Sequence, residues 1–131
     1  MNRFRVELLA ADRTECIDDV VGFVGEDASG SFGLMAGHER FMTVLVFGLA
    51  RLRLADGRRL FVGLPGGLLD FRADGLHIST RRYLLGDDAA GIGRALASEL
   101  LAEEQALATT LSKLRRLEAE MLQRLAQLEA A

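Results

Sequence analysis

The chain has 131 residues, a length that suits one compact domain with an appendage and excludes a multidomain enzyme. Hydrophobic residues make up 50% of it and charged residues 27%, a composition that supports a buried core and excludes an intrinsically disordered chain. The formal net charge of −3 gives no general attraction to phosphate backbones or anionic lipid, so we do not expect a nucleic acid partner.

Three local features predict a cytosolic protein. Cys16 is the only cysteine and cannot form an internal disulfide. The charge of Glu7 falls where a signal peptide needs an apolar stretch. The longest uncharged apolar run, residues 60–69, is about half as long as a membrane span and is interrupted by glycine and proline. We therefore expect no direct membrane insertion.

The first part of the chain, up to residue 86, has the pattern of short strands. It contains all seven phenylalanines and the only proline. Phe4, Val6 and Leu8 alternate with charged residues, which is the period of a strand with one buried face. Further strands are expected near residues 17–24 and 41–47.

Two hairpins follow at residues 50–64 and 69–80, each with an Asp-Gly turn. Between them, Pro65-Gly66-Gly67 predicts a corner where a strand changes sheet. Several short strands at regular spacing favour an antiparallel β-sandwich or flattened barrel over a βαβ fold for this part of the chain.

The rest of the chain is predicted to be helical. Asp87 and Asp88 stand where a helix would begin, since carboxylates there interact with exposed backbone amides. Apolar side chains then recur at helical spacing, at Leu96, Leu100, Leu107, Leu111, Leu114, Met121, Leu125 and Leu128.

The Thr109-Thr110 pair is the best candidate for a break in this helix, because Thr is a usable N-cap and a poor interior residue. No Gly or Pro marks a turn there, so the residues leave open both a hairpin of two helices and one long helix. Opposite net charges on residues 87–108 and 109–131 favour the hairpin.

No convergent catalytic set is evident. The two histidines, His38 and His77, and the single cysteine do not have the spacing of a zinc site. Gly91-Ile-Gly93 lacks the third glycine of a dinucleotide-binding fingerprint. We therefore predict a noncatalytic interaction protein with no catalytic residues, no metal and no cofactor.

The densest signal is Gly30-Ser-Phe-Gly33-Leu-Met-Ala-Gly37-His38, with three glycines in eight residues. Such a segment either needs conformations that other residues avoid or comes close to another chain. A tight inter-strand loop and a docking surface are both compatible with this spacing.

This motif, followed by Thr43 and Gly48 and then by Gly66-Gly67-Leu-Leu-Asp-Phe, resembles the epsilon subunit of bacterial F-type ATP synthases. The likeness covers nearly the whole chain. It implies an N-terminal antiparallel β-sandwich, residues 1–86, and a C-terminal α-helical hairpin, residues 87–131.

The resemblance also implies a noncatalytic subunit of the rotor's central stalk in a proton- or sodium-translocating ATP synthase. In that family the sandwich binds the gamma subunit and sits on the ring of c subunits, so the protein would be peripheral on the cytoplasmic side of the plasma membrane. The partner interface carried over by motif comprises Ser31, Phe32, Gly33, Gly37, His38, Glu39, Arg40, Phe41 and Met42.

Within this implied interface, Ser31 and the loop around it would face the c ring. His38 and the segment Glu39 to Met42 would lie against gamma. Phe41 and Met42 could serve as apolar anchors, or could equally begin a core strand.

The helical tail of the family can extend along gamma into the alpha/beta catalytic head and block ATP hydrolysis. By analogy Lys113, Arg115 and Arg116 are the expected regulatory contacts. The alternative is a solvated helix face with Arg116–Glu120 and Glu120–Arg124 ion pairs.

Departures from the family pattern indicate a divergent branch, such as an alternate ion-pumping ATPase. Ala36 replaces the proline that usually precedes the Gly-His pair, and no aspartate lies three residues before Arg94-Ala95, so ATP binding is not expected. The competing hypothesis is a freestanding β-sandwich adaptor whose tail forms a homomeric coiled coil. A small β-sandwich enzyme ranks third.

Overall fold

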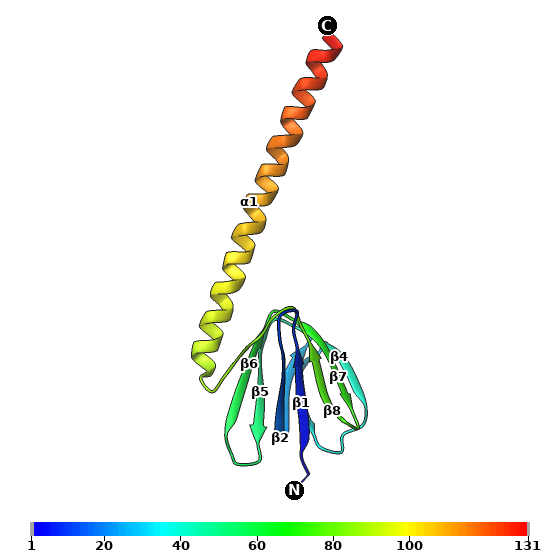
Figure 1. The fold of residues 1–131 in the computed structure, drawn as a ribbon, viewed down its shortest axis with the longest axis vertical. Helices are drawn as coiled ribbons and strands as arrows, with labels where there is room; N and C mark the ends of the chain where they lie inside the picture. Colours follow the sequence, from blue (N-terminus) through cyan, green and yellow to red (C-terminus); the bar gives the residue numbers. More distant parts are fainter. Residues whose placement is uncertain (1, 131) are drawn as a thin grey trace. The chain divides into compact units, whose positions relative to one another are not determined.

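The computed structural model describes residues 2–130, as nine strands followed by one helix (Figure 1). Their bounds are β1 Phe4–Leu9, β2 Thr14–Asp27, β3 Gly30–Met35, β4 Phe41–Leu45, β5 Gly48–Leu54, β6 Arg59–Leu64, β7 Gly67–Arg72, β8 Gly75–Ser79, β9 Leu84–Gly86 and α1 Ala89–Ala130. The predicted change from strands to helix near residue 86 is confirmed.

The strands form one continuous hydrogen-bonded system that folds back on itself. Their order is β1-β8-β7-β4-β2-β5-β6-β9, with β3 on β2 and an additional pairing of β1 with β2. All pairings are antiparallel except that of β1 with β8. Because β1 joins both β8 and β2, the strands enclose a core, and the predicted β-sandwich is confirmed.

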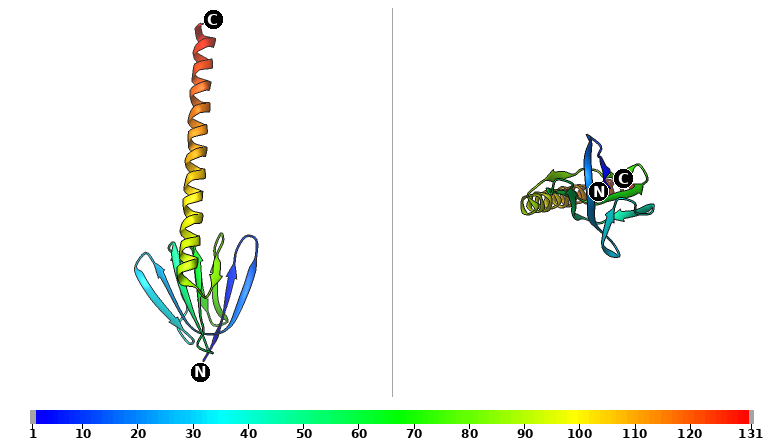
Figure 2. Two further views of the ribbon diagram at one scale, coloured as in Figure 1. Left: turned by 90° about the vertical axis from the view of Figure 1, so that its left-hand side faces the viewer. Right: turned by 90° about the horizontal axis from the view of Figure 1, so that it is seen from below.

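The long strand β2 connects the two halves of the sandwich. Its first half pairs with β1, and its second half pairs with β3 and β5. Asp19 has a φ of 60°, and the registers with both β1 and β5 shift beside it, which is the geometry of a bulge that bends a strand. Figure 2 shows the β1–β2 and β2–β3 hairpins at opposite sides of the sandwich.

The corner predicted at Pro65-Gly66-Gly67 is confirmed. Strand β6 ends before it beside β5 and β9, and β7 begins after it beside β4 and β8. Gly66 has a φ of 140°, and a Cβ on Gly67 would lie 2.6 Å from the carbonyl oxygen of Ser79. The two glycines therefore let the chain cross between sheets against the end of β8.

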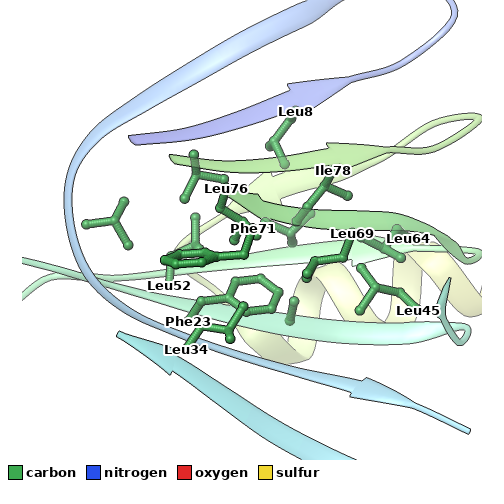
Figure 3. Packing of buried hydrophobic residues seen from close by; sticks show 14 of the residues in the cluster. Leu8, Phe23, Leu34, Leu45, Leu52, Leu64, Leu69, Phe71, Leu76 and Ile78 are labelled. Carbon is green, nitrogen blue, oxygen red and sulfur yellow. The ribbon is translucent and has the colours of Figure 1, made fainter. Parts of the chain in front are cut away.

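The core lies between the inward faces of the strands (Figure 3). Each strand contributes alternate side chains, as the period of two predicts. Burial of a Leu, Ile or Phe side chain contributes about 1.5–3 kcal/mol. The most deeply buried large side chains are Phe23, Leu8, Leu52, Leu69, Leu76 and Ile78.

The predicted helical hairpin is wrong, because α1 is one unbroken helix (Figure 1). The Thr109 and Thr110 hydroxyl groups donate hydrogen bonds to the carbonyl oxygens of Gln105 and Ala106, each at 3.0 Å. The hydroxyls therefore bond within the helix and do not cap a new one. Without Gly or Pro at this point, nothing in the local sequence ends the helix.

By its contacts the chain divides into two compact units, Met1–Ala97 and Ser98–Ala131. The first turns of α1 therefore belong with the strands, beyond the predicted boundary after residue 86. Ile92 is 9% exposed, and a Cβ on Gly63 of β6 would lie 2.7 Å from its Cγ2 atom. Asp88 precedes the helix as predicted, and its carbonyl accepts a hydrogen bond from the Ile92 amide at 3.0 Å.

Candidate interaction surface

The predicted interface residues lie on β3, on β4 and on the turn between these strands. Among the residues that the structure describes, β3 pairs only with β2, so its other edge is open. Strand β4 pairs along its length with β7 and meets β2 only where Leu45 lies opposite Asp27. The predicted residues are therefore brought together at one margin of the sandwich.

On β3 the predicted residues face in different directions. Ser31 and Gly33 are exposed, whereas Phe32 is half-buried. The Phe32 ring packs against Phe41, at 5.2 Å between centroids, and against Phe23, at 6.1 Å. Ser31 and Gly33 can thus contact another molecule directly, while Phe32 fixes the position of the strand that carries them.

The turn after β3 holds His38 in a defined orientation. Gly37 has a φ of 86°, and the His38 amide donates a hydrogen bond to the carbonyl of Met35 at 3.1 Å. The His38 ring lies 6.0 Å from the rings of both Phe41 and Phe71, and its Nδ1 atom is 2.7 Å from the carbonyl oxygen of Glu39. Edge-to-face contacts with two aromatic rings therefore hold the exposed imidazole in place.

The two roles that the sequence left open for Phe41 and Met42 are divided between them. Phe41 is half-buried and packs on the core side of β4, against Phe32. Met42 points outward with 53% of its surface exposed. Only Met42 is thus placed to act as an exposed apolar anchor.

Met42 belongs to a larger apolar surface. Val44, two residues along β4, is 65% exposed, and its cross-strand partner Leu68 on β7 is 44% exposed. We call Met42, Val44 and Leu68 the β4–β7 patch. Val44 and Leu68 are not among the predicted interface residues, although the alternation of residues 41–45 would have placed Val44 beside Met42 on the outward face.

A charged group borders this patch. Asp70 lies opposite Met42 in the register, with its carboxylate 3.0 Å from Arg72 Nε and 4.0 Å from Arg40 Nε. Its Oδ1 atom is buried and accepts no hydrogen bond within residues 2–130. A buried acceptor without a hydrogen-bond donor is unfavourable, and the positive charge of Arg40, 4.0 Å from the same atom, offsets part of that cost.

Asp27 organises the neighbouring turn and is also absent from the predicted interface. Its carboxylate accepts hydrogen bonds from the Ser29 amide at 2.9 Å, the Ser29 hydroxyl at 2.5 Å and the Thr43 hydroxyl at 2.7 Å. Bonds from Ser29 and Thr43 hold the pKa of Asp27 below its usual value. The Asp-Ala-Ser-Gly sequence has the composition of such a turn, but the contact to Thr43 depends on tertiary structure.

The basic residues predicted to be regulatory, Lys113, Arg115 and Arg116, are exposed on α1. The ion pairs expected of Glu120 with Arg116 and Arg124 are not formed in the described part of the chain. Several leucines of this unit are exposed as well, from Leu107 to Leu128.

Within the described residues, no three His, Cys, Asp or Glu side chains gather as metal ligands would. Of the helical structure that is described, no stretch combines the length and the apolarity that spanning a membrane requires.

Comparisons with known proteins agree with the fold. Residues 3–86 match the family model described as ATP synthase, Delta/Epsilon chain, beta-sandwich domain. An ATP synthase epsilon chain 2 from Cereibacter sphaeroides is 37% identical over 84 residues, which are 62% of this chain and 56% of that protein. The aligned region thus spans little more than half of that relative.

Two further likenesses extend past the strands. An ATP synthase epsilon chain from Exiguobacterium is 26% identical over 121 residues, covering 92% of this chain and 88% of that one. A chain in the Euglena gracilis mitochondrial ATP synthase structure (OSCP/F1/c-ring) has the same fold, with a TM-score of 0.62 and 19% identity over 79% of this chain and 64% of that chain. The resemblance inferred from the glycine motifs is therefore confirmed, and the chain belongs to the delta/epsilon chain family of ATP synthases through its β-sandwich domain.

Proposed function

We propose that this chain is a noncatalytic subunit of the central stalk of an F-type ATP synthase, in which its sandwich joins the gamma subunit to the c ring. The β4–β7 patch carries the proposal, because it is an exposed apolar surface beside the predicted interface residues. Membership of the family supports the assignment. The protein would then lie on the cytoplasmic side of the membrane, attached through the complex.

The patch has the composition expected of a docking surface for gamma. Met42, Val44 and Leu68 are each at least 44% exposed, and burial of such side chains contributes about 1.5–3 kcal/mol each when complete. Contiguous exposed apolar side chains rimmed by charge are typical of protein interfaces. We expect gamma to present apolar side chains to the patch.

The c ring would contact the same edge of the sandwich at the turn between β2 and β3. The β2–β3 turn is polar, and Ser29 and Ser31 are exposed there. The Asp27 carboxylate accepts a hydrogen bond from the Thr43 hydroxyl of β4 at 2.7 Å. This bond joins the turn proposed to contact the c ring to the strand proposed to contact gamma. A load applied to one surface is therefore transmitted to the other through β4.

Substitution of Met42 tests the gamma contact. We expect Met42→Glu to weaken binding of purified gamma by about tenfold or more, because it places a charge in an apolar contact. Phe47→Glu is the control, since Phe47 is an apolar side chain that is 42% exposed and lies outside both the patch and its charged border. Affinity is measured by titration calorimetry, with circular dichroism to check the fold. Equal affinities of wild type and Met42→Glu would refute the assigned surface.

We further propose that the tail restrains ATP hydrolysis through Lys113, Arg115 and Arg116. The proposal is supported by their exposure and by the lack of an ion pair to any of them among the described residues. Such cations are available to acidic segments of the alpha/beta head. The complex of which the chain is proposed to be a part would translocate protons or sodium ions.

A freestanding adaptor remains the second candidate, and the exposed apolar stripe of α1 favours it. Leu107, Leu114 and Leu125 are each more than half exposed, and a second copy of the helix could cover them. The stripe is only about three heptads long, which is marginal for a stable coiled coil. The two candidates differ in what they predict the chain binds, a second copy of itself or gamma and the c ring.

A further inference from the structure

A basic groove lies on the outward face of the sheet formed by β3, β2, β5 and β6. It has a volume of about 300 Å³. In the strand register, Gly22 of β2 lies between Met35 of β3 and Arg53 of β5, and Arg53 lies opposite Arg59 of β6. Two residues further along β2, Val24 lies opposite Arg51 of β5. The groove is thus apolar along one side and cationic along the other.

The three arginines of this groove differ from most others on the sandwich. Arg3, Arg5, Arg58 and Arg72 each form an ion pair with an aspartate. In the described part of the chain, Arg51, Arg53 and Arg59 form neither an ion pair nor a side-chain hydrogen bond. Three neighbouring cations without a counterion repel one another, so an anionic ligand would stabilise the face.

The Arg53 side chain reaches from β5 across to β2. A Cβ on Gly22 would lie in ordinary van der Waals contact with Arg53 Nη2, at 3.9 Å, so the guanidinium extends over the outward face of β2. A bound group can therefore reach both the guanidinium and the floor of the groove. Because a guanidinium binds carboxylates in bidentate geometry, carboxylate side chains fit this arrangement.

The spacing and the apolar side favour a polypeptide over a free anion. Arg51 and Arg53 are two residues apart on one strand, a separation of about 6.6–6.8 Å. Carboxylates at positions i and i+4 of a helix are about 6 Å apart along its axis. Val24 and Met35, which are 37% and 62% exposed, would contact apolar side chains that a phosphate ion lacks.

Glu26 sets the direction of the ligand. It lies on the same outward face as Val24, two residues further along β2, and it is exposed. Its carboxylate would repel an acidic group placed near it. The carboxylates of a bound segment therefore extend from Arg51 toward Arg53 and Arg59, in the direction away from Glu26.

We infer that this groove docks an acidic, amphipathic helical segment of a partner protein, with carboxylates on Arg51, Arg53 and Arg59 and apolar side chains on Val24 and Met35. The site lies beyond the proposed gamma and c-ring contacts and shares only Gly33 with the predicted interface. It does not depend on the rotor assignment.

The test uses the full chain and a fluorescent synthetic helix of about four turns, with glutamates along one side and leucines along the other. A second helix carries glutamine in place of each glutamate. The groove variant is R51Q/R53Q/R59Q. Its matched control, R3Q/R58Q/R72Q, changes the net charge equally and leaves the groove intact. Binding is followed by fluorescence anisotropy, and circular dichroism checks the fold of each variant.

We expect the glutamate helix to bind the wild-type chain about tenfold or more tightly than the glutamine helix. The groove variant should lose this preference, and the control variant should keep it. Equal binding of the two helices, or equal losses in both variants, would overturn the inference. Displacement of the helix by inorganic phosphate or a single-stranded oligonucleotide at lower concentration would also overturn it, in favour of a phosphate ligand.

Discussion

At the scale of single residues, Tyr83 fastens the segment between β8 and β9 to β2. Its side chain is 3% exposed, and its hydroxyl donates a hydrogen bond to the Glu15 carboxylate at 2.7 Å. The Arg13 guanidinium lies 4.1 Å from the ring centroid and donates to the Tyr83 carbonyl oxygen at 2.6 Å. This segment leads through β9 into α1, so Tyr83 fixes the part of the chain that precedes the helix.

Tyr83 also provides a test of the packing that is independent of function. Burial, and then the hydrogen bond to Glu15, raise the pKa of Tyr83 to about 12. Because the folded-state pKa exceeds the unfolded value near 10, the stabilisation is complete below pH 10 and is lost as the pH rises toward 12. Tyr83→Phe should remove this dependence.

The measurement is direct because Tyr83 is the only tyrosine and the chain has no tryptophan. Ultraviolet absorbance of tyrosinate therefore reports this residue alone. The folded chain should titrate with a midpoint near 12, and the chain in denaturant near 10. A midpoint near 10 under native conditions would contradict the buried position of the hydroxyl.

The sequence predicts the environment of a residue where that environment depends on neighbouring residues along the chain. The alternation along β1, the two Asp-Gly hairpins and the corner at Pro65-Gly66-Gly67 all follow from neighbouring residues. The β4–β7 patch and the basic groove do not, because Val44 meets Leu68 and Gly22 meets Arg53 only through strand register. Register between distant strands cannot be obtained from one sequence.

At the scale of elements, α1 follows some of the local signals in its sequence and overrides others. Leucine spacing and the Asp87-Asp88 start correctly predict a helix, whereas the Thr109-Thr110 pair and the charge division favoured a break that does not occur. Interior Thr lowers helix propensity by only a few tenths of a kcal/mol relative to better helix formers, which is too little to end a long helix.

The regulatory proposal for this helix is tested by truncation after Ala97. This end point keeps Ile92 and Leu96, which are 9% and 4% exposed within the first unit, so the sandwich should remain folded. We expect ATP hydrolysis by the assembled complex to rise several-fold when residues 98–131 are removed. Rates are measured with a coupled ATPase assay.

A charge variant separates the basic residues from the rest of the tail. K113Q/R115Q/R116Q should raise hydrolysis about as much as truncation, because the proposed contacts are electrostatic. The control E118Q/E120Q alters the same stretch of helix with the opposite sign of charge change. If hydrolysis stayed at the wild-type rate in both the truncated and the K113Q/R115Q/R116Q complexes, the tail would have no inhibitory role, and the rotor assignment would be unaffected.

At the scale of the whole molecule, the chain combines two units with different kinds of surface. The unit Met1–Ala97 carries the β4–β7 patch and the basic groove on the outward faces of different strands. The described part of the unit Ser98–Ala131 is helical and carries exposed leucines, and within it Lys113, Arg115 and Arg116 form no ion pair. This arrangement suits a protein that acts by binding several partners at once.

The rotor assignment is tested by affinity purification of the tagged full chain from membranes of cells that express the gamma and c subunits of the same organism. We expect gamma and the c ring to be recovered with the wild-type chain, and Met42→Glu to lower the yield of gamma. Recovery of the chain as a homodimer, with neither gamma nor the c ring, would contradict the assignment.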